Sequence, residues 1–271
     1  MKKLSILAVL LAATTFASAA DATSSLLKGV YKKYAGSLAV ARIEIKSETG
    51  TNNQTGIAVC VHTSGLFLVS GLNGNFKPES ITKCELVLPG QKQKTITARF
   101  DGFDPLTGLG FVVATQRGTF TPVAFQAKAA ISVGDKVVSL GLSPSDPALI
   151  PTLGVAYVAS VHQTPNLQIR VTGGALTSKG SLVFNSAGQA IGLVLNQPWT
   201  PYLAPNRNGG SASMMLQNQE TPLTFTPVEE FVSILANRPK GMRRMPWIAV
   251  GSYSVVHKDF AEAKGLATPA I

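Results

Sequence analysis

The chain has 271 residues, with 24 lysines and arginines against 14 aspartates and glutamates, which gives a formal charge of +10. Its residues are 45% hydrophobic and only 14% charged, and 25 glycines and 16 prolines are spread along it. This composition excludes wholesale disorder, a collagen-like repeat and a highly charged coiled coil, and it indicates a globular chain of one large or two small domains.

The first residues have the pattern of an export signal. Lys2 and Lys3 precede an apolar run over Leu4–Ala13, and Ala17–Ala19 (Ala-Ser-Ala) is a small-residue cleavage site. The apolar run is well short of the ~20 residues that cross a bilayer, and no later stretch is long and apolar enough to do so. We therefore expect a signal peptide over residues 1–19 and a periplasmic or secreted protein with no stable membrane span.

Helical spacing of apolar residues occurs only near the two ends of the chain that would remain after cleavage. One short amphipathic stretch covers 26–31, and another covers 228–235. Thr226 and Pro227 introduce the second stretch as an N-cap and a first-turn proline.

Between these stretches, short runs rich in Val, Ile, Leu and Thr are separated by Gly, Pro, Asn and Ser. They predict strands over Leu38–Ile45, Thr55–His62, Leu66–Ser70, Ile81–Leu88, Thr95–Asp101, Leu109–Ala114, Lys136–Gly141, Ile150–Val161, Leu167–Val171, Gly180–Phe184, Ala190–Leu195 and Leu223–Thr226. About a dozen strands is the number in two six-stranded barrels. We therefore expect an all-β fold, a double six-stranded β-barrel with short terminal helices. A surface loop is expected over 199–213, and Phe120–Ile131 is the expected link between the halves.

Other residue types limit the chemistry. Export permits a disulfide between Cys60 and Cys84, worth about 3 kcal/mol through loop closure, and two buried free thiols are the alternative. Metal-ligating residues show no ligand spacing, so neither a metal nor another cofactor is expected. Basic residues cluster mildly over 28–33 and 238–244 without interleaved aromatic residues, so no nucleic-acid partner is expected.

Several segments carry patterns that occur together in one protease family. They are Gly56–Asn73 (GIAVCVHTSGLFLVSGLN), Thr97–Phe111 (TARFDGFDPLTGLGF), Val133–Leu142 (VGDKVVSLGL), Thr152–Ala159 (TLGVAYVA), Gly173–Leu193 (GGALTSKGSLVFNSAGQAIGL) and Met245–Leu266 (MPWIAVGSYSVVHKDFAEAKGL). Their order and spacing resemble the trypsin-like serine proteases of the high-temperature-requirement A (HtrA, or Deg) family, over nearly the whole mature chain. That family has a double β-barrel followed by peptide-binding PDZ domains.

The resemblance also locates the positions that would carry catalysis. Acyl transfer needs a hydroxyl nucleophile, a histidine base, a carboxylate that orients the histidine, and backbone donors for the oxyanion. At the matching positions the chain has Asn73 for the histidine, Gly108 for the aspartate and Lys179 for the serine. Thr177 replaces a glycine that helps to shape the family's oxyanion hole. The resemblance thus implies a degenerate triad, and no catalytic residue is expected.

Ser178 and Ser181 flank Lys179 and are the fallback nucleophiles. Neither has an obvious base, because the nearest histidine, His62, lies eleven residues before Asn73. A serine–lysine pair would need a desolvated Lys179, whereas a lysine on a loop is normally solvated. The stretch Thr177-Ser178-Lys179-Gly180-Ser181 is instead expected to form a binding loop in the cleft between the barrels.

The family pattern implies four regions after alignment. They are the signal peptide over 1–19, an N-terminal helix and first barrel over 20–125, a second barrel and C-terminal helix over 126–240, and a truncated PDZ-like segment over 241–271. Only 24 residues follow Trp247, whereas a PDZ domain needs about 80 to 100, so a working PDZ peptide site is not expected.

These patterns predict an exported HtrA-like serine protease homologue that is catalytically inactive. Such a pseudoprotease would bind polypeptide, either unfolded proteins or a protease partner, in envelope protein quality control. The resemblance implies a homotrimer. Two alternatives are an active serine endopeptidase with a rearranged catalytic site and a structural envelope protein that keeps the barrel without a ligand.

Overall fold

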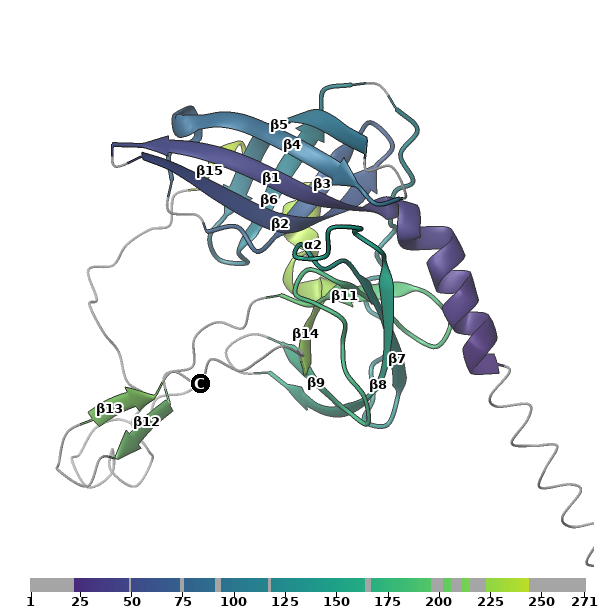
Figure 1. Ribbon diagram of the computed structural model, residues 1–271. Helices are drawn as coiled ribbons and strands as arrows, with labels where there is room; N and C mark the ends of the chain where they lie inside the picture. The colour runs from purple at the N-terminus through teal and green to yellow at the C-terminus, as the bar shows by residue number, and fades with distance from the viewer. Residues whose placement is uncertain are drawn as a thin grey trace, which may run out of the picture.

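The computed structural model describes residues 22–48, 50–73, 76–90, 94–116, 118–163, 167–195, 202–205, 211–214 and 223–243. Most of these residues form two β-barrels, one above the other in Figure 1. The predicted signal peptide and the PDZ-like segment after Arg243 lie outside the described residues.

The first barrel consists of six strands. They are β1 (Leu38–Ser47), β2 (Gly50–His62), β3 (Leu66–Ser70), β4 (Ile81–Leu88), β5 (Lys94–Asp104) and β6 (Leu109–Ala114), with a 3-10 turn η2 (Pro78–Ser80) before β4. The strand order is β5-β4-β1-β2-β3-β6, and antiparallel pairing of β5 with β6 closes the barrel. Its interior contains apolar side chains such as Ile43, Phe67 and Leu86.

The second barrel is also closed and antiparallel. Its strands are β7 (Lys136–Gly141), β8 (Thr152–His162), β9 (Gln168–Thr172), β10 (Leu182–Phe184), β11 (Ala190–Leu193) and β14 (Thr224–Pro227), in the order β10-β11-β14-β9-β8-β7. Val137, Ile169 and Phe225 lie in its interior. The expected fold class is confirmed, and each of the predicted strands has a counterpart.

A third apolar layer joins the two barrels. Leu38 and Phe111 of the first barrel pack in one buried cluster with Leu140, Leu182 and Phe184 of the second. On β1 the side chains alternate between this layer and the barrel interior, so the strand is buried on both sides over its first half. The first four residues of β1, Leu38–Ala41, are accordingly all apolar.

Helices lie at both ends of the double barrel. A helix over 22–34, followed by η1 (Ala35–Ser37), leads into β1, and Tyr34 stacks on Phe184 with ring centroids 4.9 Å apart. The expected second helix is a 3-10 turn, η3 (Val228–Glu230), continued by α2 (Val232–Ala236). Within the described part of the chain, no helix is long and apolar enough to span a membrane.

Three strands differ from the sequence expectation. β12 (Tyr202–Pro205) and β13 (Ser211–Met214) pair as a hairpin where a surface loop was expected over 199–213. β15 (Gly241–Met242) is a two-residue strand that pairs in parallel with β5 at Gly102 and Phe103. It places the end of the described chain against the first barrel.

Candidate functional site at the junction of the barrels

The three positions that match the family's triad lie around the end of β3. Asn73 follows β3, whose last residue, Ser70, pairs with Leu109, and Gly108 immediately precedes that partner. The other barrel reaches the same point, because a β-carbon added at Gly180 would lie only 2.3 Å from Ser70 Oγ. The fold therefore brings Asn73, Gly108 and the loop that carries Lys179 to one place.

Asn73 is exposed, and its backbone is fixed to β2. The side-chain amide of Gln54 donates from Nε2 to the carbonyl oxygen of Asn73 at 3.1 Å, and the amide of Asn73 donates to Gln54 Oε1 at 2.9 Å. This double contact sets the direction in which the chain leaves β3.

Gly108 ends the tight turn between β5 and β6. Its amide donates to the carbonyl oxygen of Asp104 at 2.9 Å, and its φ of 70° is in the left-handed region that favours glycine. Asp104 is buried, and its Oδ2 accepts hydrogen bonds from the amide and the hydroxyl of Thr107. The carboxylate of Asp104 thus stabilises the turn.

The hydroxyl groups of the loop 177–181 form a network over β7. The Thr177 hydroxyl donates to Ser181 Oγ at 2.7 Å, and the Ser178 hydroxyl donates to the carbonyl oxygen of Leu142 at 2.7 Å. Ser178 Oγ and Ser181 Oγ are 2.9 Å apart, and because the hydrogen of Ser178 points to Leu142, that of Ser181 must point to Ser178. Ser181 is fully buried, so both fallback nucleophiles use their hydroxyls in internal contacts.

The backbone donors of the same loop are also used internally. The amide of Thr177 donates to Ser139 Oγ, that of Ser178 to Ser181 Oγ, that of Gly180 to the Val194 carbonyl, and that of Ser181 to the Ser178 carbonyl. Among the described residues, only the Lys179 amide of this loop has no internal acceptor. An oxyanion hole needs convergent donors that are open to the ligand.

The two described histidines lie at the far ends of their strands. Ile57 pairs with Ser70 and His62 with Leu66, so His62 is about five residues, or roughly 16 Å, from the junction along β2. On β8, Thr152 pairs with Gly141 beneath the hydroxyl network, and His162 is roughly 33 Å further along the strand. Each imidazole contacts a local serine hydroxyl at 2.8 Å, Ser64 and Ser160 respectively. His257 lies outside the described residues.

Lys179 itself is exposed at this junction. Within the described ranges, no carboxylate lies within ion-pair distance of its amine. Leu106, two residues before Gly108, is an apolar side chain that is 64% exposed. The roles predicted for the triad positions and for the loop remain predictions.

The two cysteines are free thiols inside the first barrel. Cys84 pairs with Ile43 on β1, whereas Cys60 follows Val59, the partner of Leu38, so the thiols are about 20 Å apart along β1. A disulfide needs Cα atoms within about 7 Å, so the structure favours the reduced alternative.

Burial raises the pKa of Cys60, and burial together with Glu85 raises the pKa of Cys84 to about 12. Neither thiol has the lowered pKa of a nucleophile.

A second group of charges holds residues 238–243, which we call the C-terminal strap, against the first barrel. Sequence reasoning missed these ion pairs. The carboxylate of Asp101 is buried and forms ion pairs with Arg99 at 3.1 Å, Arg238 at 3.0 Å and Lys240 at 3.3 Å. Arg243 pairs with Asp104 at 3.0 Å. Nothing in the local sequence around Asp101 and Asp104 indicates that they pair with cations 139 residues away.

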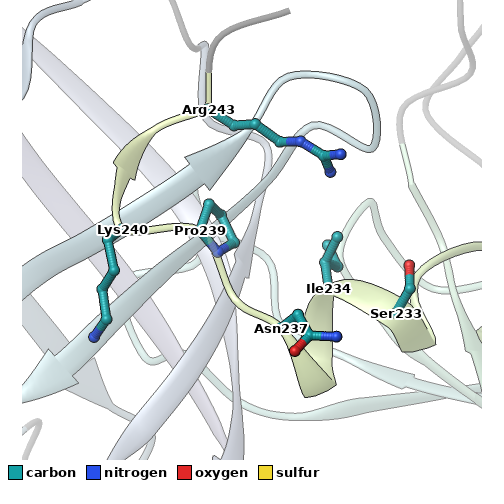
Figure 2. A pocket seen from close by; sticks show the side chains of 6 residues that line it. All are labelled: Ser233, Ile234, Asn237, Pro239, Lys240 and Arg243. Atoms are coloured by element: carbon teal, nitrogen blue, oxygen red, sulfur yellow. The ribbon is translucent and has the colours of Figure 1, made fainter.

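The strap and α2 border a hollow of about 460 Å³. In Figure 2, Arg243 extends toward α2, above Ile234, while Lys240 extends on the other side of Pro239. Among the described residues, no three His, Cys, Asp or Glu side chains are close enough together to hold a metal ion.

Two closed six-stranded antiparallel barrels define the trypsin-like double-barrel fold. Among solved structures, 336 chains match this chain. One of them is the crystal structure of Deg5, with a TM-score of 0.54 and 13% identity over 78% of this chain and 92% of that chain. This likeness shows an HtrA-like protease fold. Comparisons with protein-family models and with curated proteins find no match.

Proposed function

We propose that the protein is an exported pseudoprotease that binds unfolded polypeptide at the junction of its two barrels without cleaving it. The observation that carries the proposal is the engagement of the loop 177–181, whose hydroxyls and amides are bonded within the protein. With Asn73, Gly108 and Lys179 at the triad positions, the described residues at the junction include no histidine base, no free serine hydroxyl and no open pair of oxyanion donors.

The surface at the junction is suited to contact with a polypeptide. Lys179 offers an ammonium group to a carboxylate, Leu106 offers an exposed apolar side chain, and Asn73 is also exposed. Binding without cleavage needs only such contacts, because only catalysis requires groups that are complementary to a transition state. The export signal over residues 1–19 and the resemblance to an envelope protease family support a role in envelope protein quality control.

The first test is for catalysis. The purified protein and the variants Ser178→Ala, Lys179→Ala and Ser181→Ala are incubated with unfolded casein and, separately, with a fluorophosphonate probe. We expect neither cleavage nor labelling. Cleavage that is lost in one of these variants would establish the alternative, an active serine endopeptidase with a rearranged site.

The second test is for binding. Fluorescein-labelled, chemically unfolded casein is titrated with the protein, and fluorescence anisotropy is measured. We expect saturable binding that Lys179→Glu weakens severalfold. The control is Lys46→Glu, which makes the same charge change at an exposed position near the β1–β2 turn. The absence of binding would contradict the proposal even if the protein proves inactive.

A further inference from the structure

One row of side chains on the N-terminal helix over 22–34 is the most deeply buried against the second barrel. Val30 and Tyr34 are buried in the layer between the barrels, and Leu26 packs against the same layer. Gly188, in the turn between β10 and β11, lies under this row, because an added β-carbon there would be 3.6 Å from Leu26 Cδ1. The helix is therefore held along one edge, as its position beside β7 and β8 in Figure 1 illustrates.

The adjacent row of side chains on the helix faces β8, and a groove lies between this row and the strand. Thr23, Leu27 and Tyr31, spaced four residues apart, lie on one side of a hollow of about 890 Å³, and Leu153 of β8 lies on the other. Leu27 and Leu153 are half-buried, so they form a recessed apolar floor, whereas Tyr31 is 39% exposed.

The outer lip of the groove is basic. Lys28 and Lys32 are both exposed, and at a spacing of four residues they extend from the same side of the helix. No acidic residue borders the groove, and neither lysine has an ion-pair partner in the described part of the chain. A third amine, that of Lys136, donates to the Thr23 hydroxyl at 2.7 Å at one end of the groove.

We propose that this groove is a docking site for an acidic amphipathic segment of another polypeptide. Apolar side chains of such a segment would enter between Leu27, Tyr31 and Leu153, and its carboxylates would pair with Lys28 and Lys32. The groove has an apolar floor and a basic lip, and none of its lining residues is acidic. A segment that carries apolar side chains on one face and carboxylates beside them is complementary to both features. The inference does not depend on the proposed function, because the groove is formed by the helix and β8 rather than by the loop 177–181.

Two other occupants fit the groove less well. A flat membrane surface could reach Lys28 and Lys32 but not the recessed side chains of Leu27 and Leu153. A second copy of the chain carries a formal charge of +10, so its approach to a basic lip is electrostatically disfavoured.

The test uses a fluorescein-labelled peptide of about 18 residues, which spans five helical turns, with leucines along one face and glutamates on either side. Anisotropy is measured for the purified protein, for Lys28→Glu/Lys32→Glu and for the matched control Lys46→Glu/Lys77→Glu, which reverses two exposed lysines on the first barrel. A second peptide has lysines in place of the glutamates. Tyr31→Ser tests the apolar contact without a change of charge, at a position that is exposed enough to tolerate it. Thermal unfolding checks that each variant is folded.

We expect the acidic peptide to bind with a Kd in the micromolar range, and both Lys28→Glu/Lys32→Glu and Tyr31→Ser to weaken binding at least tenfold. The control variant should change the Kd by less than about twofold, and the lysine peptide should not bind. Equal binding of the two peptides, or equal loss in the control variant, would overturn the proposal. Loss of a dimer in gel filtration on Lys28→Glu/Lys32→Glu, or binding to phosphatidylglycerol vesicles without binding to the peptide, would assign the groove to another occupant.

Discussion

The amide of Thr177 donates a hydrogen bond to Ser139 Oγ at 3.0 Å. Ser139 is fully buried in β7, so the contact attaches the start of the loop 177–181 to the wall of the second barrel. In the family that the sequence resembles, this part of the chain shapes the oxyanion hole. The engaged backbone donor is therefore an obstacle to catalysis that is separate from the degenerate triad that we propose.

The first prediction concerns restoration of the triad. The triple variant Asn73→His/Gly108→Asp/Lys179→Ser should react only slowly with a fluorophosphonate, because the Thr177 amide stays bonded to Ser139 and one oxyanion donor is lost. Adding Ser139→Ala should increase labelling, since a single oxyanion donor is worth about 10²–10³ in rate. Gly108→Asp is admissible at a φ of 70°, because aspartate adopts this region more readily than most residues. Rapid labelling of the triple variant alone would contradict this account of the loop.

The second prediction concerns the hydroxyl network over Gly141. A β-carbon added there would lie 1.8 Å from Ser181 Oγ, 2.7 Å from Thr177 Oγ1 and 2.8 Å from Ser178 Oγ. Gly141→Ala should lower the free energy of unfolding by about 1–3 kcal/mol, as overpacking does in other proteins. Urea unfolding of Gly141→Ala, Ser181→Ala and the double variant gives the coupling between the sites. We expect Ser181→Ala to relieve part of the Gly141→Ala loss, and strictly additive effects would show that the two positions do not compete for space.

Much of the fold could be predicted from the sequence, because each barrel strand is a short apolar run between turn residues. The predicted start of β2 at Thr55 was late, since the strand begins at Gly50. Its first residues, Thr51, Asn52 and Asn53, are polar and exposed, and they belong to the strand because they pair with β1. The sequence of β15 has no strand pattern. Its backbone pairs in parallel with β5 at Gly102, and Asp101 holds the neighbouring strap residues Arg238 and Lys240.

The candidate site was predictable only in part. The resemblance located Asn73, Gly108 and Lys179, and the structure brings these positions together at Ser70. The bond between Thr177 and Ser139 could not be predicted, because the residues are 38 positions apart and Ser139 lies within an apolar strand. Local pattern carries no information about such a contact.

The third prediction concerns the anchoring of the C-terminal strap. Asp101→Asn removes the charge that attracts Arg99, Arg238 and Lys240, and it should destabilise the protein by about 2–3 kcal/mol. Glu85→Gln, which breaks the partly exposed pair with Lys83, should cost less than about 1 kcal/mol and is the control. Limited trypsin digestion should cut after Lys240 faster in Asp101→Asn than in the parent. Equal digestion rates would show that the ion pairs do not hold the strap.

The fourth prediction tests the close approach of the strap to β5. A β-carbon at Gly102 would lie 2.0 Å from the carbonyl oxygen of Pro239, and backbone atoms cannot move aside as a flexible side chain does. Gly102→Ala should therefore release the strap even though Asp101 is unchanged, and digestion after Lys240 should accelerate as in Asp101→Asn. The control is Gly90→Ala, where no atom lies within 4 Å of the added carbon but the backbone φ of 141° is strained. Gly90→Ala should lower overall stability without exposing the strap, whereas similar digestion of the two glycine variants would refute the steric argument.

The fifth prediction concerns the pH dependence of stability. Burial and the neighbouring Glu85 raise the pKa of Cys84 from its ordinary value near 9.0 to about 12. Above pH 9 the unfolded thiol loses its proton while the folded thiol keeps it, so the folded state binds more protons and stability falls as pH rises. The stabilisation is complete below about pH 9, declines by about 1.4 kcal/mol per pH unit up to about pH 12, and is absent in Cys84→Ala. Urea unfolding of the parent protein and of Cys84→Ala is measured from pH 7 to 11. The difference between their unfolding free energies should be constant at pH 7–8 and should shrink above pH 9. A difference that stays constant to pH 11 would contradict burial of a neutral thiol at Cys84.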